Sequence, residues 1–138
     1  MFHKQILGFF EKNRGNIYSV FRIAVALLFF EHGAQKLYGW FGGTQVQLIS
    51  ILGLAGVIEF YGGILIALGL FTRYASFLAV CTMIAGWFMA HVGPGIAGWI
   101  PIVNRGELAL VYLVSFLVIL FNGSGKWALD NKFFRKKS

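Results

Sequence analysis

Glu59 is the side chain most informative about chemistry, because it lies near the middle of the otherwise uncharged run 48–71. An ionisable group at the centre of a bilayer costs at least about 2.5–3.5 kcal/mol on insertion scales, and such groups usually mark functional sites. A partner charge, a hydrogen bond or a polar cavity must offset that free energy. We therefore expect Glu59 to face other helices and to belong to a functional site.

Other polar side chains are spaced so that they could act with this carboxylate. A histidine changes its charge near neutral pH and can exchange protons with a carboxylate or with a bound ligand. We therefore predict that Glu59 and His32 are catalytic residues. The predicted ligand-binding residues are the remaining charged and histidine side chains of the apolar segments and their outer ends, namely Glu31, Lys36, His91, Arg105, Glu107 and Arg22.

A membrane-embedded scaffold is needed to position these residues. The 138-residue chain is 58% apolar and 12% charged, and soluble domains carry about twice that charged fraction. Four apolar stretches are long enough to cross, or nearly cross, a hydrocarbon core of about 30 Å; they are 17–37, 48–71, 74–91 and 107–121. Backbone groups in lipid must be satisfied within their own segment, so these stretches should be helices. The predicted fold is all-α, a single four-transmembrane-helix bundle formed by residues 1–138.

Basic residues predict the orientation of this bundle, because short loops rich in Lys and Arg stay on the cytoplasmic side. The net charge is +7, and most Lys and Arg lie in the short amino-terminal arm, in the second connection and in the tail. Both termini should therefore be cytoplasmic. The same basic excess suits anionic lipids of the bilayer, and we expect no nucleic-acid partner.

Depth along each helix predicts which polar residues meet. The first and third helices run outward and the others run inward, so most ionisable residues fall in the outer half of the bundle. Glu59 lies at mid-membrane, on a face of small residues that allows close helix packing. Arg22 is the exception, because it lies near the cytoplasmic side, where it can snorkel, pair with a carboxylate or reach toward Glu59.

Five parts of the chain carry a family resemblance. They are RIAVALLFFEHGAQKL (22–37), IEFYGGILIALGLFTRYA (58–75), His91 at the end of the third helix, NRGELALVY (104–112) and NGSGKWALD (122–130). Together they resemble the DoxX family, small four-helix proteins of bacterial membranes that are often named as oxidoreductases. The resemblance implies a multi-pass protein of the bacterial cytoplasmic (inner) membrane. The family is similar to a subunit of a thiosulfate:quinone oxidoreductase, but no defined catalytic cycle comes with the name.

The first functional hypothesis is an oxidoreductase subunit that binds quinone, quinol or a related small redox ligand in the outer half of the bundle. Glu59 and His32 would hydrogen-bond the ring oxygens and relay protons. The sequence contains no haem, flavin or iron–sulfur motif, so electrons would come from a redox partner protein or a diffusible donor. Helix faces rich in glycine also make a homodimer plausible. Whether the protein is an enzyme stays open at this stage.

The main alternative is a non-catalytic accessory or assembly factor for a partner membrane complex. In that case the buried charges form a structural ion-pair network that specifies how the helices dock. The network would contain Arg22, Glu31, Lys36, Glu59, Arg105 and Glu107. A transporter is a further class, because intramembrane charges also mark ion pathways.

Two other chemistries fit the residues less well. Metal binding would use His32, His91, Glu31 and Glu107, but the Glu-x-x-His and His-Glu-x-x-His patterns of helical metal sites are absent. No metal is therefore assigned. A disulfide relay needs at least two cysteines, and the chain has one, Cys81.

Overall fold

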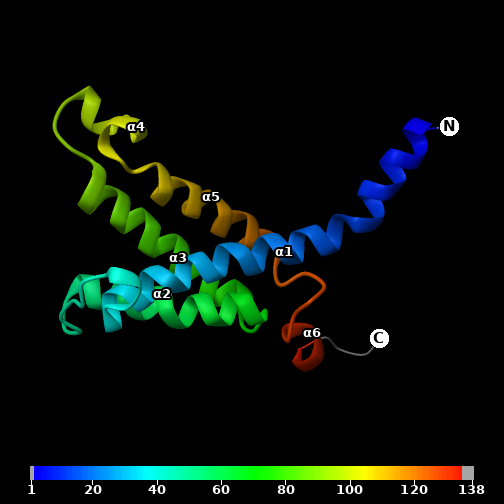
Figure 1. Cartoon of the computed structure of the whole chain (residues 1–138), viewed down its shortest axis with the longest axis horizontal. Helices are drawn as coiled ribbons and strands as arrows, with labels where there is room; N and C mark the ends of the chain where they lie inside the picture. The colour runs from blue at the N-terminus through cyan, green and yellow to red at the C-terminus, as the bar shows by residue number, and fades with distance from the viewer. Residues whose placement is uncertain (1, 135–138) are drawn as a thin grey trace.

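Four long helices dominate the structure, a computed structural model that describes residues 2–134 (Figure 1). They are α1 (Phe2–Tyr38), α2 (Ile51–Leu68), α3 (Thr72–Gly86) and α5 (Glu107–Asn122). The shorter elements are η1 (Trp40–Gly42), η2 (Trp87–His91), η3 (Ile96–Trp99), α4 (Pro101–Asn104) and α6 (Asp130–Phe133). The described residues contain no strand, which confirms the predicted all-α class.

Within residues 2–134, three helical segments are long and apolar enough to cross a membrane: α1, α2, and α3 continued by η2 to His91. The fourth apolar helix, α5, has 16 residues and is about 24 Å long. It is therefore shorter than a hydrocarbon core of about 30 Å. The turn that precedes it, α4, is a separate element, because Arg105 between them adopts a left-handed conformation with a φ of 59°.

The bounds of α1 and α2 differ from those expected from hydropathy. The helix α1 begins at Phe2 instead of near residue 17, and its first turns project away from the other helices (Figure 1). The helix α2 begins after Ser50, whose hydroxyl accepts a hydrogen bond of 3.0 Å from the Gly53 amide. It ends at Leu68 and is capped by Gly69, whose left-handed φ of 66° is one that glycine adopts without strain.

The helices α1 and α2 pack closely through glycines. A Cβ atom added at Gly33 of α1 would lie 2.2 Å from the backbone nitrogen of Phe60, and one added at Gly63 would lie 2.8 Å from the carbonyl oxygen of Ala26. Both glycines are buried. Because lipid removes the hydrophobic drive between membrane helices, such close backbone approach is a main source of their association. This pairing agrees with the small-residue face predicted for α2.

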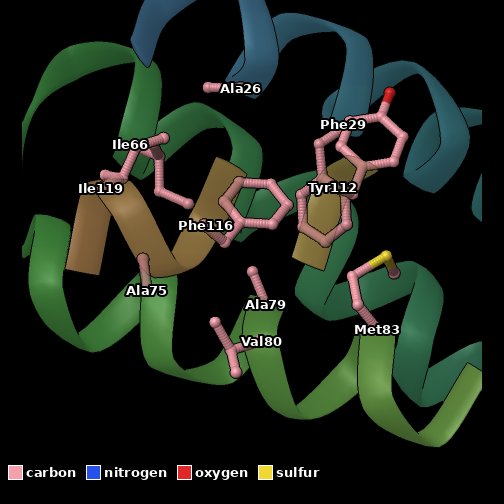
Figure 2. Close-up of a cluster of buried hydrophobic side chains, with 10 residues drawn as sticks. All are labelled: Ala26, Phe29, Ile66, Ala75, Ala79, Val80, Met83, Tyr112, Phe116 and Ile119. Carbon is pink, nitrogen blue, oxygen red and sulfur yellow. The ribbon is translucent and has the colours of Figure 1, made fainter. Parts of the chain in front are cut away.

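An apolar cluster joins α3 and α5 to the α1–α2 pair (Figure 2). The rings of Phe29 and Phe116 have centroids 4.5 Å apart, and Tyr112 stacks beside Phe116. Figure 2 shows the Tyr112 hydroxyl pointing away from the other side chains of the cluster. Beyond this cluster, toward the end that carries the α1–α2 loop, α3 and α5 diverge from α1 and α2 (Figure 1). Phe29, Met83 and Tyr112 of the cluster also line a cavity between the two helix pairs.

Replacing Gly63 by alanine should destabilise the protein by about 1–3 kcal/mol, the usual cost of overpacking a close contact. The new methyl group would meet the carbonyl oxygen of Ala26 on α1. Gly62→Ala is the matched control, because the nearest atom to a Cβ there is a methyl carbon of Ile58 at 3.9 Å. Thermal unfolding of both variants in one detergent measures the difference, and equal melting temperatures would contradict the close helix contact.

Candidate functional site

A cavity of about 510 Å³ occupies the space between the two helix pairs, with walls from α1, α2, α3, η2 and α5. That volume suits a small organic ligand. Most of the lining is apolar and comes from α2 and α3. The polar lining side chains are His32, Lys36, Glu59, Thr82, His91, Arg105 and Tyr112. A few polar groups within an apolar wall are the arrangement that orients a ligand in a binding site.

Glu59 pairs with Lys36 across the contact between α1 and α2. The Lys36 Nζ atom lies 2.6 Å from Oε1 and 2.5 Å from Oε2, so both carboxylate oxygens accept from it. The Glu59 side chain is 4% exposed and the Lys36 side chain is 27% exposed. An ammonium group has three N–H donors, and the carboxylate engages two of them. Lys36 therefore retains one donor, and its side chain lines the cavity.

His32 and Tyr112 lie together on the cavity wall. Their rings meet edge to face, with centroids 5.7 Å apart and an interplanar angle of 88°. Within residues 2–134, neither side chain forms a hydrogen bond to another protein group. The imidazole nitrogens and the phenol oxygen are thus available to a ligand. Tyr112 was not among the predicted site residues, although its place in the segment 104–112 was a signal that could have identified it.

The end of α3 widens into a π-helix, η2, which carries His91 to the cavity. The Nδ1 atom of His91 lies 3.3 Å from the carbonyl oxygen of Asn104, and Trp87 stacks on the imidazole ring. Trp87 also packs on Gly106, where an added Cβ would lie 2.4 Å from the indole. Single π-helical turns are frequent at functional sites. Nothing in the sequence predicted this turn.

The cavity brings together a subset of the predicted site residues, namely His32, Lys36, Glu59, His91 and Arg105. Glu31 and Glu107 are exposed and do not contribute to its lining. The predicted ion-pair network is not formed as a whole, because Lys36–Glu59 is the one salt bridge between side chains of the described region. Its other members therefore do not dock these helices by charge pairing.

Arg22 lies away from the cavity and is fully buried. Its guanidinium donates to the carbonyl oxygens of Ile66, Ala67 (2.8 Å) and Trp127. The last carbonyl groups of a helix lack intrahelical partners and carry partial negative charge. Arg22 thus satisfies the end of α2 and ties it to the segment after α5. The sequence analysis considered that Arg22 could snorkel or pair with a carboxylate. In the structure it does neither.

The same segment also closes the turn between α2 and α3. The Asp130 carboxylate accepts hydrogen bonds from the amides of Phe71 (2.7 Å) and Thr72 (3.1 Å), at the start of α3. The backbone amide of Leu129 donates to the carbonyl oxygen of Leu68 at 3.2 Å. The backbone amide of Asp130 donates to the carbonyl oxygen of Gly69 at 2.8 Å. We call residues 127–130 the C-terminal clasp. It positions the end of α2 and the start of α3 through hydrogen bonds to their backbone.

The residues considered for a metal do not converge. Within the described part of the chain, no three side chains of the His, Cys, Asp and Glu types come close enough to hold an ion. The set His32, His91, Glu31 and Glu107 is therefore not a ligand cluster. Cys81 lines the cavity instead.

Comparison with known proteins gives matches along most of the chain. Residues 17–92 match the sequence model of the DoxX family. An uncharacterised protein of Haemophilus influenzae is 43% identical over 130 residues, covering 91% of this chain and 97% of its own length. A Bacillus subtilis protein named "Putative oxidoreductase CatD" is 27% identical over 123 residues, with 84% and 86% covered. An uncharacterised membrane protein of Mycobacterium tuberculosis is 26% identical over 126 residues, with 80% and 77% covered. No solved structure matches the chain.

Lys36→Met should destabilise the fold by about 3 kcal/mol, because removing one partner of a buried pair leaves an uncompensated charge. The double variant Lys36→Met/Glu59→Leu should recover most of that loss, since it removes both charges. Lys12→Met, at an exposed position of α1, is the control. Unfolding of the three variants in the same detergent as wild type gives the free energy of unfolding of each. A single Lys36 variant as stable as wild type would contradict the pairing.

Proposed function

This chain belongs to the DoxX family, and on that premise we propose that it is a membrane oxidoreductase subunit that binds quinone or quinol in the cavity beside the Lys36–Glu59 pair. A relative in Bacillus subtilis carries an oxidoreductase name. The family match begins within α1, at residue 17, and extends past η2, so it includes His32, Lys36, Glu59 and His91.

The observation that carries the proposal is a bidentate ion pair on the wall of an apolar cavity. The donor that Lys36 retains can bind a quinone carbonyl oxygen, which accepts hydrogen bonds but cannot donate them. Reduction of a quinone takes up two electrons and two protons, and the hydroxyl groups of the resulting quinol can donate to Glu59 or His32. The same side chains therefore suit both forms of the ligand.

Each polar side chain has a stated part in this proposal. Lys36 orients the ring and compensates the Glu59 charge. Glu59 and His32 move protons to and from the ring oxygens, and Tyr112 supports His32 through its ring contact. His91 and Arg105, at the ends of η2 and α4, contribute polar contacts from the loop side of the cavity. Electrons come from a redox partner protein or a diffusible donor.

The apolar wall supports a lipid-soluble ligand. Leu52 and Ala55 of α2 and Cys81 and Ala85 of α3 line the cavity from two helices that diverge at this end. In a bilayer, a quinone tail would lie along these side chains. We place the protein in the bacterial inner membrane with both ends in the cytoplasm, because the basic residues concentrate at those ends.

A second candidate, a non-catalytic accessory or assembly subunit, is favoured by a different observation. The Lys36–Glu59 pair joins α1 to α2 and compensates the buried charge without any ligand. Buried pairs can specify packing and have no catalytic part. In this case the protein would purify with a stoichiometric partner complex and without quinone.

Mass spectrometry of organic extracts tests the proposed function. Protein purified in mild detergent and incubated with excess quinone should retain about one quinone per chain. Glu59→Gln and His32→Ala should retain at least about tenfold less, because each loses a polar group that binds the ring oxygens. Glu31→Gln is the matched control, since Glu31 is an exposed carboxylate outside the cavity.

Melting temperatures of all variants separate loss of binding from loss of folding. Quinone retained equally by wild type and a folded Glu59→Gln would exclude the proposed site. An absence of quinone from saturated wild type, together with a stoichiometric partner protein, would favour the accessory subunit.

A further inference from the structure

A second cavity, also of about 510 Å³, lies where the segment after α5 folds against the end of α2. It shares no lining residue with the first cavity. Its walls are Ala67, Leu68, Lys126, Trp127, Ala128, Leu129, Asn131 and Lys132. Two of these side chains are cationic and none is a carboxylate. The cavity therefore has the charge that an anion requires.

The backbone that carries the two lysines is held by hydrogen bonds, and both lysine side chains are exposed. The C-terminal clasp is fixed by Arg22 and by the backbone of the α2–α3 turn. The side-chain amide of Asn131 donates to the carbonyl oxygens of Gly125 (2.7 Å) and Lys126 (3.2 Å), which closes the loop between the lysines. The Lys126 side chain also packs on α1, since a Cβ at Gly15 would lie 2.5 Å from its Cε atom. A site ordered before binding loses less entropy when its ligand binds.

The one carboxylate of the clasp does not compete for these lysines. Both Asp130 oxygens accept hydrogen bonds from the Phe71 and Thr72 amides. No described side chain forms a salt bridge with Lys126 or Lys132. Their charges are thus free for an external anion.

The surroundings of the cavity place it at the membrane surface. Trp127, in its wall, is 52% exposed, and further exposed aromatic side chains surround this end of the bundle: Phe71, Tyr74, Phe133 and Phe134. Tryptophan and tyrosine concentrate at the level of lipid headgroups. The cavity also combines an apolar edge, from Ala67 and Leu68 at the end of α2, with its two ammonium groups.

We propose that this cavity binds the phosphate of an anionic phospholipid headgroup, with Lys126 and Lys132 as its cationic ligands. Basic pockets beside membrane helices recognise anionic headgroups in this way. The apolar edge faces the glycerol and upper acyl chain, which a free phosphate ion lacks. The lipid would thereby bridge α2 and the C-terminal clasp. This site is independent of the quinone proposal, since the two cavities share no residue.

Native mass spectrometry of the full chain in mild detergent tests the site. Phosphatidylglycerol is titrated against wild type, the double variant Lys126→Gln/Lys132→Gln, and the control Lys4→Gln/Lys12→Gln on the projecting part of α1. The lipid Kd should rise at least about tenfold in the first variant, from the loss of two lysine contacts. It should change less than about twofold in the control, which has the same net charge.

Two further titrations distinguish the source of the phosphate. Phosphatidylcholine should bind much more weakly than phosphatidylglycerol, and inorganic phosphate at millimolar concentration should not displace the lipid. Displacement by phosphate that depends on both lysines would assign the site to free phosphate and overturn the lipid assignment. Equal lipid affinity of the two lysine variants, with melting temperatures near wild type, would show that the cavity binds no anion.

Discussion

The bond between Lys36 and Glu59 is the interaction on which the candidate site depends. It joins α1 to α2 and compensates a buried carboxylate that would otherwise carry a large desolvation cost. The glycine contacts at Gly33 and Gly63 bring the helix backbones close enough for this bond. The Lys36 side chain also lines the cavity. One interaction therefore contributes both to helix packing and to the polarity of the cavity.

Buried polar groups at the opposite end of the bundle also find their partners inside the protein, and there the groups belong to the backbone. Carbonyl groups at the end of α2 need donors inside the protein, and Arg22 supplies them, while Asp130 accepts from the free amides of α3. Both side chains act on helix ends, where partial charges concentrate. Charged residues of this chain thus have two uses in the structure: pairing across helices and completing helix termini.

The all-α class and the apolar segments were predictable, because hydropathy and helical periodicity depend on one segment at a time. The same reasoning predicted His32 and Lys36 in the outer half of the bundle and Glu59 at mid-membrane, and all three side chains line the cavity. The partners of Arg22 were not predictable, because Trp127 lies 105 residues away along the chain. The π-helix at His91 was not predictable, and its Trp87 contacts Gly106, which lies far along the chain and which no local pattern records. Glu31 and Glu107 are exposed because neighbouring helices do not cover their faces.

The short length of α5 has a consequence for the surrounding lipid. A helix of 16 residues beside α1, whose apolar part covers about residues 17–37, gives the protein an uneven hydrophobic thickness around its circumference. Lipid adjusts to a short apolar surface by local thinning, at a cost of a fraction of a kcal/mol for each ångström of mismatch. The annulus of lipid next to α5 would thus be thinner than the annulus next to α1. Such asymmetry favours neighbours with a matching short face, and it gives the protein a preferred lateral orientation toward them in the plane of the membrane.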